Sequence, residues 1–402
     1  MRKYIIVLFL IFIIGCGMNE SGNSLLNNTS VPNIYNENSN PLTGTDATLK
    51  IPPVPSDIVI KFLAAGDNII HESVYLDAKN RARSDTPEFN FIDMYDGIAD
   101  LIKSADIAFV NQETPIAGSE YGYSGHPNFN SPREAGDTLV DLGFDIINIA
   151  NNHMLDKKEI GLLKTIEYWE TKDVLLLGAF RNAEDYDKIR VYEEHGVKIA
   201  FLTYTYSTNG MTLDIGSKHI IPMQSEVDLR RQILLAKEAG DLVFVSMHWG
   251  NEDEYVPSST QKYLAQIMVD MGVDVIIGHH PHVVQPIIWA ENADGHRTLI
   301  IYSLGNLIST MHPSYNMVGM MVTFDIIKEP NEQPYVDNPL CIPVMCHYNT
   351  DRRGLQVYLL EDYTPELAAA HGSQLIKTFT FESLRKIITD NIAPEFLSEY
   401  YK

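Results

Sequence analysis

Three histidines follow an apolar run in the stretch Asp274-Val275-Ile276-Ile277-Gly278-His279-His280-Pro281-His282. A β-branched run that stops at a glycine predicts a buried strand, and the histidines then lie in a loop at the edge of a sheet. Imidazole is the commonest side-chain metal ligand, and α/β proteins bind ligands in such loops. The stretch therefore predicts a metal site, provided that the rest of the chain supplies oxygen ligands. A turn that is merely rich in histidine is the alternative.

The composition is that of a globular protein. The chain has 402 residues, of which 45% are hydrophobic and 10% aromatic, enough for one large domain or two. Its formal net charge of -23 argues against binding to nucleic acid and against electrostatic attachment to anionic lipid. An acidic protein can still hold an anionic polymer locally if metal ions supply positive charge.

The N-terminus predicts export. Arg2 and Lys3 precede an apolar run over residues 4–14, which is too short for a transmembrane helix and suits a signal peptide. The run ends in Ile13-Ile14-Gly15-Cys16, which resembles a bacterial lipobox. The resemblance implies cleavage before Cys16, a lipid on its sulfur, and an extracytoplasmic protein anchored to the cell membrane. An ordinary signal peptide with an incidental cysteine is the alternative. Residues 1–16 thus form the leader, and the polar residues 17–56 predict a flexible tether.

Two further cysteines lie close together in the sequence. Cys341 and Cys346 are separated by four residues, so an exported chain could join them in a local disulfide. Two unpaired core thiols are the equal alternative, and the absence of a second cysteine pair argues against a zinc site.

Strand and helix patterns alternate from residue 57 onward. The predicted strands are residues 58–64, 107–110, 146–150, 174–177, 199–204, 242–247, 275–277, 299–304 and 317–326. The predicted helices are residues 91–102, 139–142, 160–169, 227–239 and 263–271. This alternation predicts an α/β fold with sheets buried on both faces, in one domain over residues 57–328. The pattern loosens afterwards, so residues 329–402 are expected as a C-terminal extension packed on the domain, with an edge strand at 357–360 and terminal helices.

Polar residues follow several of these strands. The ends carry Asp67, Glu113, Asn152-His153 and His248, and His71 follows Asp67 by four positions. Each residue alone could be a turn residue, because Asp and Asn favour turns. Together they would place oxygen and nitrogen ligands along one sheet edge, a mixture that suits Mn, Zn or Fe. A carboxylate that bridges two ions about 3.5–4 Å apart is the arrangement of two-metal hydrolases.

The combination of motifs resembles a known family. The motifs are Gly66-Asp67, Asn111-Gln112-Glu113, Ala150-Asn151-Asn152-His153 with Asp156, His248-Trp249-Gly250, Gly278-His279-His280-Pro281-His282, and Tyr302-Ser303-Leu304-Gly305-Asn306. In this order they resemble the calcineurin-like metallophosphoesterase superfamily and, within it, the CapA-type proteins of poly-γ-glutamate capsule synthesis. The resemblance covers roughly residues 59–308.

The resemblance implies a four-layer α/β/β/α sandwich of metallophosphoesterase type and a site with two divalent metal ions. It implies that His153 contacts the scissile group and protonates the leaving group. The metal ligands that it implies are Asp67, Glu113, Asn152, His248, His280 and His282. Asn111, Asp156 and Asn306 are expected to contact and orient these residues.

The sequence also departs from the superfamily pattern. Position 69 is Ile where a histidine ligand is usual, which makes His71 a further candidate ligand. Glu113 stands where Asp is usual, and the acid that follows the Asn-His pair is displaced to Asp156. His279 is expected beside the site or pointing outward, and Glu252 is close enough in sequence to reach it. The histidines without a motif, expected at the surface or in loops, are His126, His195, His219, His296, His312, His347 and His371.

These features lead to three functional hypotheses. The first is a lipid-anchored CapA-like protein that helps to make or export a poly-γ-glutamate-type capsule, with membrane capsule-synthesis proteins and the anionic polymer as partners. The second is a broad metal-dependent phosphoesterase without a capsule role. The third is a non-catalytic scaffold subunit that binds the polymer and keeps the ligands without hydrolysis.

Overall fold

The computed structural model describes residues 56–402 apart from 86, 312, 376 and 378. The predicted leader, Cys16 and the predicted tether up to residue 55 lie outside these described residues, as does His312. Within the described part of the chain, no helix is long and apolar enough to cross a membrane.

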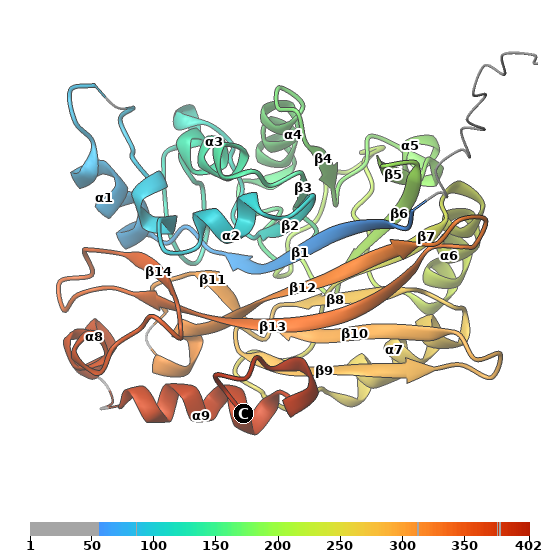
Figure 1. The fold of residues 1–402 in the computed structure, drawn as a ribbon. Coiled ribbons are helices and arrows are strands. Elements are labelled where there is room, and N and C mark those ends of the chain that lie inside the picture. The colour runs from blue at the N-terminus through green and yellow to red at the C-terminus, as the bar shows by residue number, and fades with distance from the viewer. Residues whose placement is uncertain (1–55, 86, 312, 376, 378) are drawn as a thin grey trace, which may run out of the picture. The chain divides into compact units, whose positions relative to one another are not determined.

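The described strands form two sheets (Figure 1). The first sheet has the order β14-β13-β12-β1-β2-β3-β4, and β11 pairs with β1 beside this path. Its parallel half is built from β1 (Ile58–Asn68), β2 (Ile107–Gln112), β3 (Ile146–Asn148) and β4 (Leu175–Leu177). The other strands are β11 (Asn306–Ile308), β12 (Val318–Lys328), β13 (Tyr335–His347) and β14 (Gln356–Leu359).

The second sheet has the order β5-β6-β7-β8-β10-β9. Its central strands are parallel, and the edge strands β5 and β9 are antiparallel to their neighbours. The strands are β5 (Arg190–Glu194), β6 (Val197–Thr205), β7 (Leu242–His248), β8 (Val275–His279), β9 (Val284–Glu291) and β10 (Arg297–Leu304).

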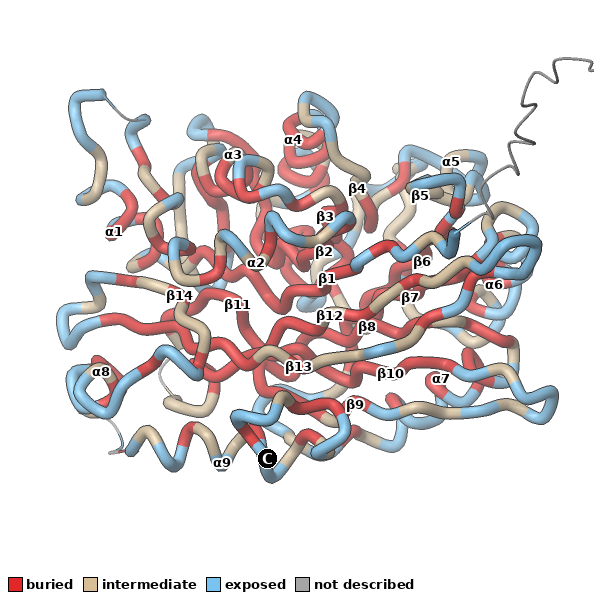
Figure 2. The backbone as a smooth tube through the Cα atoms, viewed as in Figure 1, coloured by how far each residue is buried: buried red, intermediate tan, exposed pale blue. Residues whose placement is uncertain are grey.

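An aromatic cluster joins the two sheets. Phe62 of β1 stacks on Phe324 of β12 with ring centroids 4.8 Å apart, and it meets Phe244 of β7 edge-on at 5.3 Å. Phe201 of β6 completes the cluster. These buried contacts show that the sheets pack face to face, and Figure 2 shows the central strands as the most buried part of the chain.

Helices cover the outer faces of the sheets. Figure 1 shows α2 (Ala99–Lys103), α3 (Arg133–Leu142) and α4 (Lys158–Trp169) over the parallel half of the first sheet. On the second sheet, α6 (Glu226–Ala239) and α7 (Ser259–Asp270) bury Leu229 and Met268 in a separate cluster with Val243. The other helices are α1 (Glu72–Arg81), α5 (Ala183–Asp187), α8 (Pro365–Ala370) and α9 (Phe381–Asn391). The predicted α/β fold of two sheets with flanking helices is confirmed.

The segment after Lys328 contributes two strands, β13 and β14, to the first sheet. We expected residues 329–402 as an extension packed on the domain, with an edge strand at 357–360. The edge strand is confirmed as β14 (Gln356–Leu359), whereas β13, which pairs with β12 along most of its length, was not expected. The boundary expected at residue 328 therefore falls between two hydrogen-bonded strands. Pro339, Pro343 and the Asp337-Asn338 pair interrupt the apolar pattern of β13, so its sequence does not read as a strand.

The two cysteines of β13 are free and buried. They are an odd number of residues apart on one strand, so their side chains point to opposite faces, and about 16 Å of extended chain separates them. Cys341 contacts the sulfur of Met320, and Cys346 donates to the carbonyl of Ser309 at 3.1 Å. The local disulfide that the sequence left open does not form.

Two histidines expected at the surface or in loops are buried instead. His347 ends β13 and lies 2.7 Å from the hydroxyl of Tyr363, and His371 follows α8 with no exposed surface. Each satisfies its ring nitrogens locally, which allows burial as a neutral side chain. A lone histidine carries no sequence signal that separates this role from an exposed one.

Candidate metal centre

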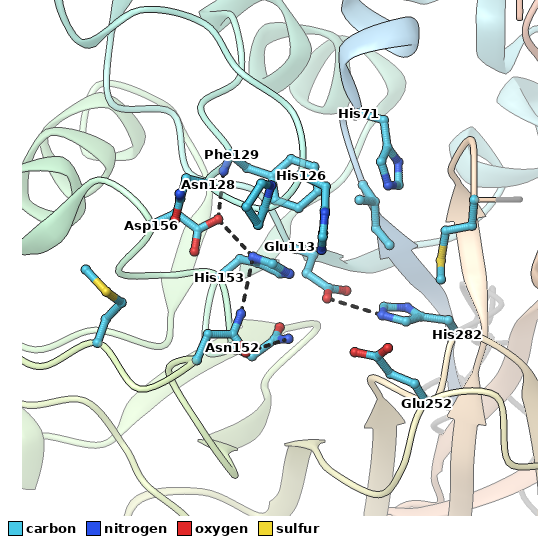
Figure 3. A pocket seen from close by; sticks show the side chains of 15 residues that line it. His71, Glu113, His126, Asn128, Phe129, Asn152, His153, Asp156, Glu252 and His282 are labelled. Atoms are coloured by element: carbon cyan, nitrogen blue, oxygen red, sulfur yellow. Dashed lines mark hydrogen bonds and ion pairs between the residues drawn. The ribbon is translucent and has the colours of Figure 1, made fainter.

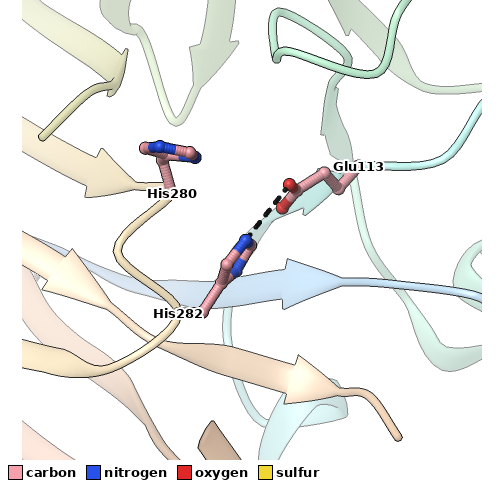
Figure 4. Close-up of side chains that lie close together, drawn as sticks. All are labelled: Glu113, His280 and His282. Carbon is pink, nitrogen blue, oxygen red and sulfur yellow. Dashed lines mark ion pairs between the residues drawn. The ribbon is translucent and has the colours of Figure 1, made fainter. Parts of the chain in front are cut away.

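The candidate ligands come together from both sheets at one edge. Asp67 ends β1 and Glu113 directly follows β2 in the first sheet, whereas His248 ends β7 in the second. His280 and His282 lie just after β8. Among the described residues, two groups of possible ligand atoms lie within 4.8 Å of one another, namely Glu113, His280 and His282, and Asp67, Glu113 and His248. Glu113 belongs to both groups and faces the two histidines of the loop in Figure 4.

The buried polar atoms of this cluster lack hydrogen-bond partners. Both carboxylate oxygens of Glu113 and the Nδ1 atoms of His248 and His280 are buried and unpaired. Burial and the neighbouring Asp67 carboxylate raise the pKa of Glu113 well above its usual range. Burial lowers the pKa of His280 to about 3, so its ring is neutral and can offer a lone pair. Such atoms are costly to bury alone, and mixed carboxylate and imidazole donors fit a divalent cation.

Asp67 also holds the histidine loop. Its Oδ2 accepts the backbone N–H of His280 at 3.2 Å and lies 3.2 Å from Nδ1 of His282. His280 and His282 both have left-handed backbones, with φ of 95° and 57°. Such conformations are costly for residues other than glycine and persist where surrounding contacts impose them, often at functional sites.

The residues expected to orient the ligands are in place around Asp67 and His282. Asn111 donates to Oδ1 of Asp67 at 2.8 Å, and Oδ1 of Asn306 lies 3.0 Å from Nδ1 of His282. With its Nδ1 directed to Asn306 and Asp67, His282 presents Nε2 to Glu113, 3.7 Å from Oε1. Burial alone would lower the pKa of His282, but the carboxylates of Glu113 and Asp67 raise it to about 10.

Asn152 and His153 flank the ligand cluster. Oδ1 of Asn152 lies 3.0 Å from Nε2 of His248, so the predicted amide ligand adjoins the imidazole ligands. Nδ1 of His153 lies 2.8 Å from Oδ2 of Asp156, and the same oxygen accepts the backbone N–H of Phe129 at 2.7 Å. The His153 ring points into a cavity in Figure 3, so its free nitrogen is directed at whatever the cavity binds.

That cavity has a volume of about 330 Å³ and opens beside the candidate ligands. Its lining residues are Ile69, His71, Glu113, His126, Pro127, Asn128, Phe129, Asn152, His153, Asp156, Asn209, Met211, Glu252, His282 and Met311. None of the lining residues is a lysine or an arginine. A negatively charged group in the cavity must therefore be held by metal ions, imidazoles and amides.

Three uncertain sequence candidates have defined places. His71 lines the cavity but lies outside both ligand groups found among the described residues, and its Nδ1 accepts the backbone N–H of Thr310. His279 is fully buried, with Nδ1 3.2 Å from Oδ1 of Asp67, so it contacts a ligand and does not point outward. Glu252 is exposed and lines the cavity near His282 in Figure 3.

Sequence reasoning missed several residues of the site. Asn148 donates to Oδ1 of Asn111 at 2.9 Å and accepts from Thr203 at 2.6 Å, which links Asp67 to the second sheet. A polar residue inside an apolar strand was the available signal for Asn148. Asn209 and His126 also line the cavity, but they come from loops without any motif.

Comparison with known proteins identifies the family. The family model described as bacterial capsule synthesis protein PGA_cap matches residues 61–311, which include every candidate ligand. The chain belongs to this family. The family resemblance inferred from the motifs is therefore confirmed.

Two relatives with curated descriptions are similar to about half of the chain. The PGA biosynthesis protein CapA of Bacillus subtilis (strain 168) is 32% identical over 212 residues, which are 52% of this chain and 54% of that protein. The capsule biosynthesis protein CapA of Bacillus anthracis is 34% identical over 186 residues, 45% of this chain and 44% of that protein. The chain thus spans about half the length of these two curated relatives. Among solved structures, the NAD nucleotidase of Haemophilus influenzae matches 86% of this chain and 65% of its own, with a TM-score of 0.45 and 10% identity.

Proposed function

We propose that this protein takes part in the synthesis or export of a poly-γ-glutamate-type capsule polymer and acts through a binuclear metal site. One observation carries the proposal. Within the segment that matches the PGA_cap family, buried side chains that could bind a metal ion lie close together. They are Asp67, Glu113, His248, His280 and His282, and several of their nitrogen and oxygen atoms have no hydrogen-bond partner. The site gives an acidic protein a means of holding an anionic polymer.

The residues around the site suit hydrolysis. Mn, Zn or Fe ions held by these ligands would lower the pKa of a bound water and neutralise an anionic oxygen of the substrate. Glu113 belongs to both ligand groups and would help to hold either ion. His153 is held by Asp156 with one nitrogen toward the cavity, where it can protonate a leaving group.

We also propose that the mature protein is anchored through a lipid on Cys16 to the extracytoplasmic side of the cell membrane. The lipobox-like sequence at residues 13–16 supports the anchor. Partners there would be membrane proteins of capsule synthesis and the polymer itself. A net charge of -23 disfavours nucleic acid as a partner.

A metal-dependent phosphoesterase without a capsule role is the second candidate. The observation that favours it is the His153–Asp156 pair beside the ligand cluster, because a scaffold that only binds polymer has no use for an oriented proton donor. A non-catalytic scaffold subunit would keep the ligands and lack turnover.

Gene deletion with complementation tests the capsule role. Deletion should remove surface polymer, the wild type should restore it, and His280→Ala should fail to do so. His195→Asn is the matched control, because His195 is exposed, is far from the motifs in sequence, and has a left-handed backbone that Asn tolerates. Rescue by His280→Ala would reject a role for the metal site in capsule formation.

Metal analysis of purified protein separates the remaining candidates. About two ions per chain with turnover of a chromogenic phosphodiester or monoester would support an enzyme. Bound metal without turnover would support a scaffold. If the purified protein shows turnover and deletion of its gene leaves the surface polymer unchanged, the second candidate is supported. If the wild type partitions into detergent and the Cys16→Ser variant does not, the lipid anchor is supported. If both proteins partition equally, the anchor is rejected.

A further inference from the structure

Three imidazole rings surround the side chain of Phe129 on the wall of the cavity. Phe129 is buried, and it meets the rings of His71, His126 and His153 edge-on with centroids 5.3, 6.2 and 4.7 Å away. The interplanar angles are 77°, 75° and 89°. Edge-to-face packing of this kind fixes ring orientation, so one phenylalanine sets the direction of three potential hydrogen-bond donors.

His71 presents a donor to the cavity. Its Nδ1 accepts the backbone N–H of Thr310 at 3.3 Å, so a neutral His71 ring carries its proton on Nε2. Figure 3 shows the ring directed into the cavity. A protonated Nε2 cannot bind a metal ion, but it can donate to an oxygen of a ligand.

The loop that carries His126 is fixed at three points. Ser124 and Asn130 pair as a β-bridge, and the N–H of Phe129 is bound to Asp156. Gly125 lies against the start of α1, where an added Cβ would come 2.7 Å from the backbone nitrogen of Glu72. His126 is therefore exposed to solvent and yet held at the cavity mouth beside His71.

His71 and His126 lie on the Phe129 side of the cavity in Figure 3. Glu113, Asn152 and His282 line the metal side, and Glu252 adds a carboxylate near His282. Because no lysine or arginine lines the cavity, an anionic group there can be bound only by imidazole and amide N–H donors, and His71 and His126 are two of these imidazoles.

We propose that His71 and His126 form a second anion subsite, which binds a carboxylate of the substrate while the neighbouring unit occupies the metal centre. The substrate class is an oligomer with regularly spaced carboxylates, such as γ-linked glutamate. This inference rests on the proposed function, since it assigns an occupant to the same site.

Calorimetric titration with a γ-linked glutamate pentamer tests the subsite. His71→Ala and His126→Ala should each weaken pentamer binding about tenfold, as expected for loss of a hydrogen bond to a charged group, and the double variant should weaken it further. His126→Gln keeps an N–H donor and should retain more affinity than His126→Ala. His195→Asn should bind like the wild type. The ratio of pentamer affinities between the wild type and each variant should stay the same after chelator treatment, because the subsite does not depend on metal.

Inorganic phosphate is the second probe, since it can occupy the metal centre alone. Its affinity should be the same for the wild type and both alanine variants. If the alanine variants lost affinity equally for phosphate and for the pentamer, these histidines would contact the group bound at the metal centre. That result would overturn the proposed subsite. If the double variant bound the pentamer as tightly as the wild type does, the subsite would be overturned and the proposed function would stand. A wild type that binds phosphate but no pentamer would overturn the proposed function together with it.

Discussion

The backbone N–H of His280 donates to Oδ2 of Asp67 across 3.2 Å, although the two residues are 213 positions apart in the sequence. The bond connects β1 of the first sheet to the loop after β8 of the second. Asp67 is thus a candidate ligand that also imposes the left-handed backbone at His280, and the geometry of the centre depends on how the two sheets pack.

Replacement of Glu113 should separate stability from metal binding. Glu113→Gln removes a buried carboxylate whose oxygens have no hydrogen-bond partners, so the metal-free variant should be more stable than the metal-free wild type by about 1–2 kcal/mol. Metal at 100 times its dissociation constant should stabilise the wild type by about 2.7 kcal/mol and the variant much less. Thermal unfolding with and without chelator measures both effects, and an equal metal response in both proteins would remove Glu113 from the ligand set.

Loss of the Asp156 carboxylate should impair chemistry and leave metal binding intact. Asp156→Asn removes the carboxylate that orients His153, so turnover of a chromogenic phosphodiester should fall about 100-fold. Metal content should stay unchanged, because Asp156 is outside both ligand groups found in the described residues. Asp351→Asn, at an exposed position, is the control. Undiminished turnover would mean that His153 needs no such orientation.

Gly278 should tolerate no side chain. A Cβ there would lie 1.9 Å from the carbonyl oxygen of Tyr302 on the paired strand β10, and backbone atoms cannot yield cheaply. Gly278→Ala should lower the free energy of unfolding by about 3 kcal/mol or more in a denaturant titration. Gly196→Asn, at an open position with a left-handed backbone, should cost little. Comparable losses in both variants would contradict the steric explanation.

His371 should make the fold sensitive to acid. Its Nε2 donates to the carbonyl of Cys346 and its Nδ1 accepts the N–H of Ser373, so the ring has no place for a second proton. Burial lowers its pKa to about 4. The neutral His371 ring therefore contributes fully to the free energy of unfolding above the pKa of about 6.5 that histidine has in the unfolded chain. This contribution, up to about 3 kcal/mol, is lost as the pH falls through about 4. Unfolding of the wild type and His371→Gln at pH 7.5 and 4.5 should show a smaller acid loss in the variant; equal losses would assign the effect elsewhere.

The thiols of β13 should be inert in the folded protein. Burial raises the pKa of the Cys346 thiol to about 12, and Cys341 is equally enclosed. A thiol reagent should label neither residue until denaturant is added, when both should react. Rapid labelling under native conditions would show that β13 opens.

The sequence indicated which strand ends carry the candidate ligands, but it did not indicate every strand of the fold. The ends of the parallel neighbours β1 and β2 share an edge of the first sheet, and those of β7 and β8 share an edge of the second. The packing of the two sheets then brings both sets of motifs together. The pattern did not reveal β13, whose prolines and polar residues hide a strand that its neighbours stabilise. It also could not reveal the wall around Phe129, since two of the partners of that ring, His71 and His153, come from distant segments. Local patterns report periodicity, whereas such a wall depends on tertiary packing.

The division of the ligands between two sheets has a consequence for how the protein acquires its metal. Asp67 and Glu113 belong to one sheet and His248, His280 and His282 to the other, so no single folding unit contains a complete ligand group. Metal can then be captured only after the sheets dock, when the chain has already reached the compartment in which it folds. For a protein exported as we propose, the identity of the ion would be decided by the metal supply outside the cytoplasm.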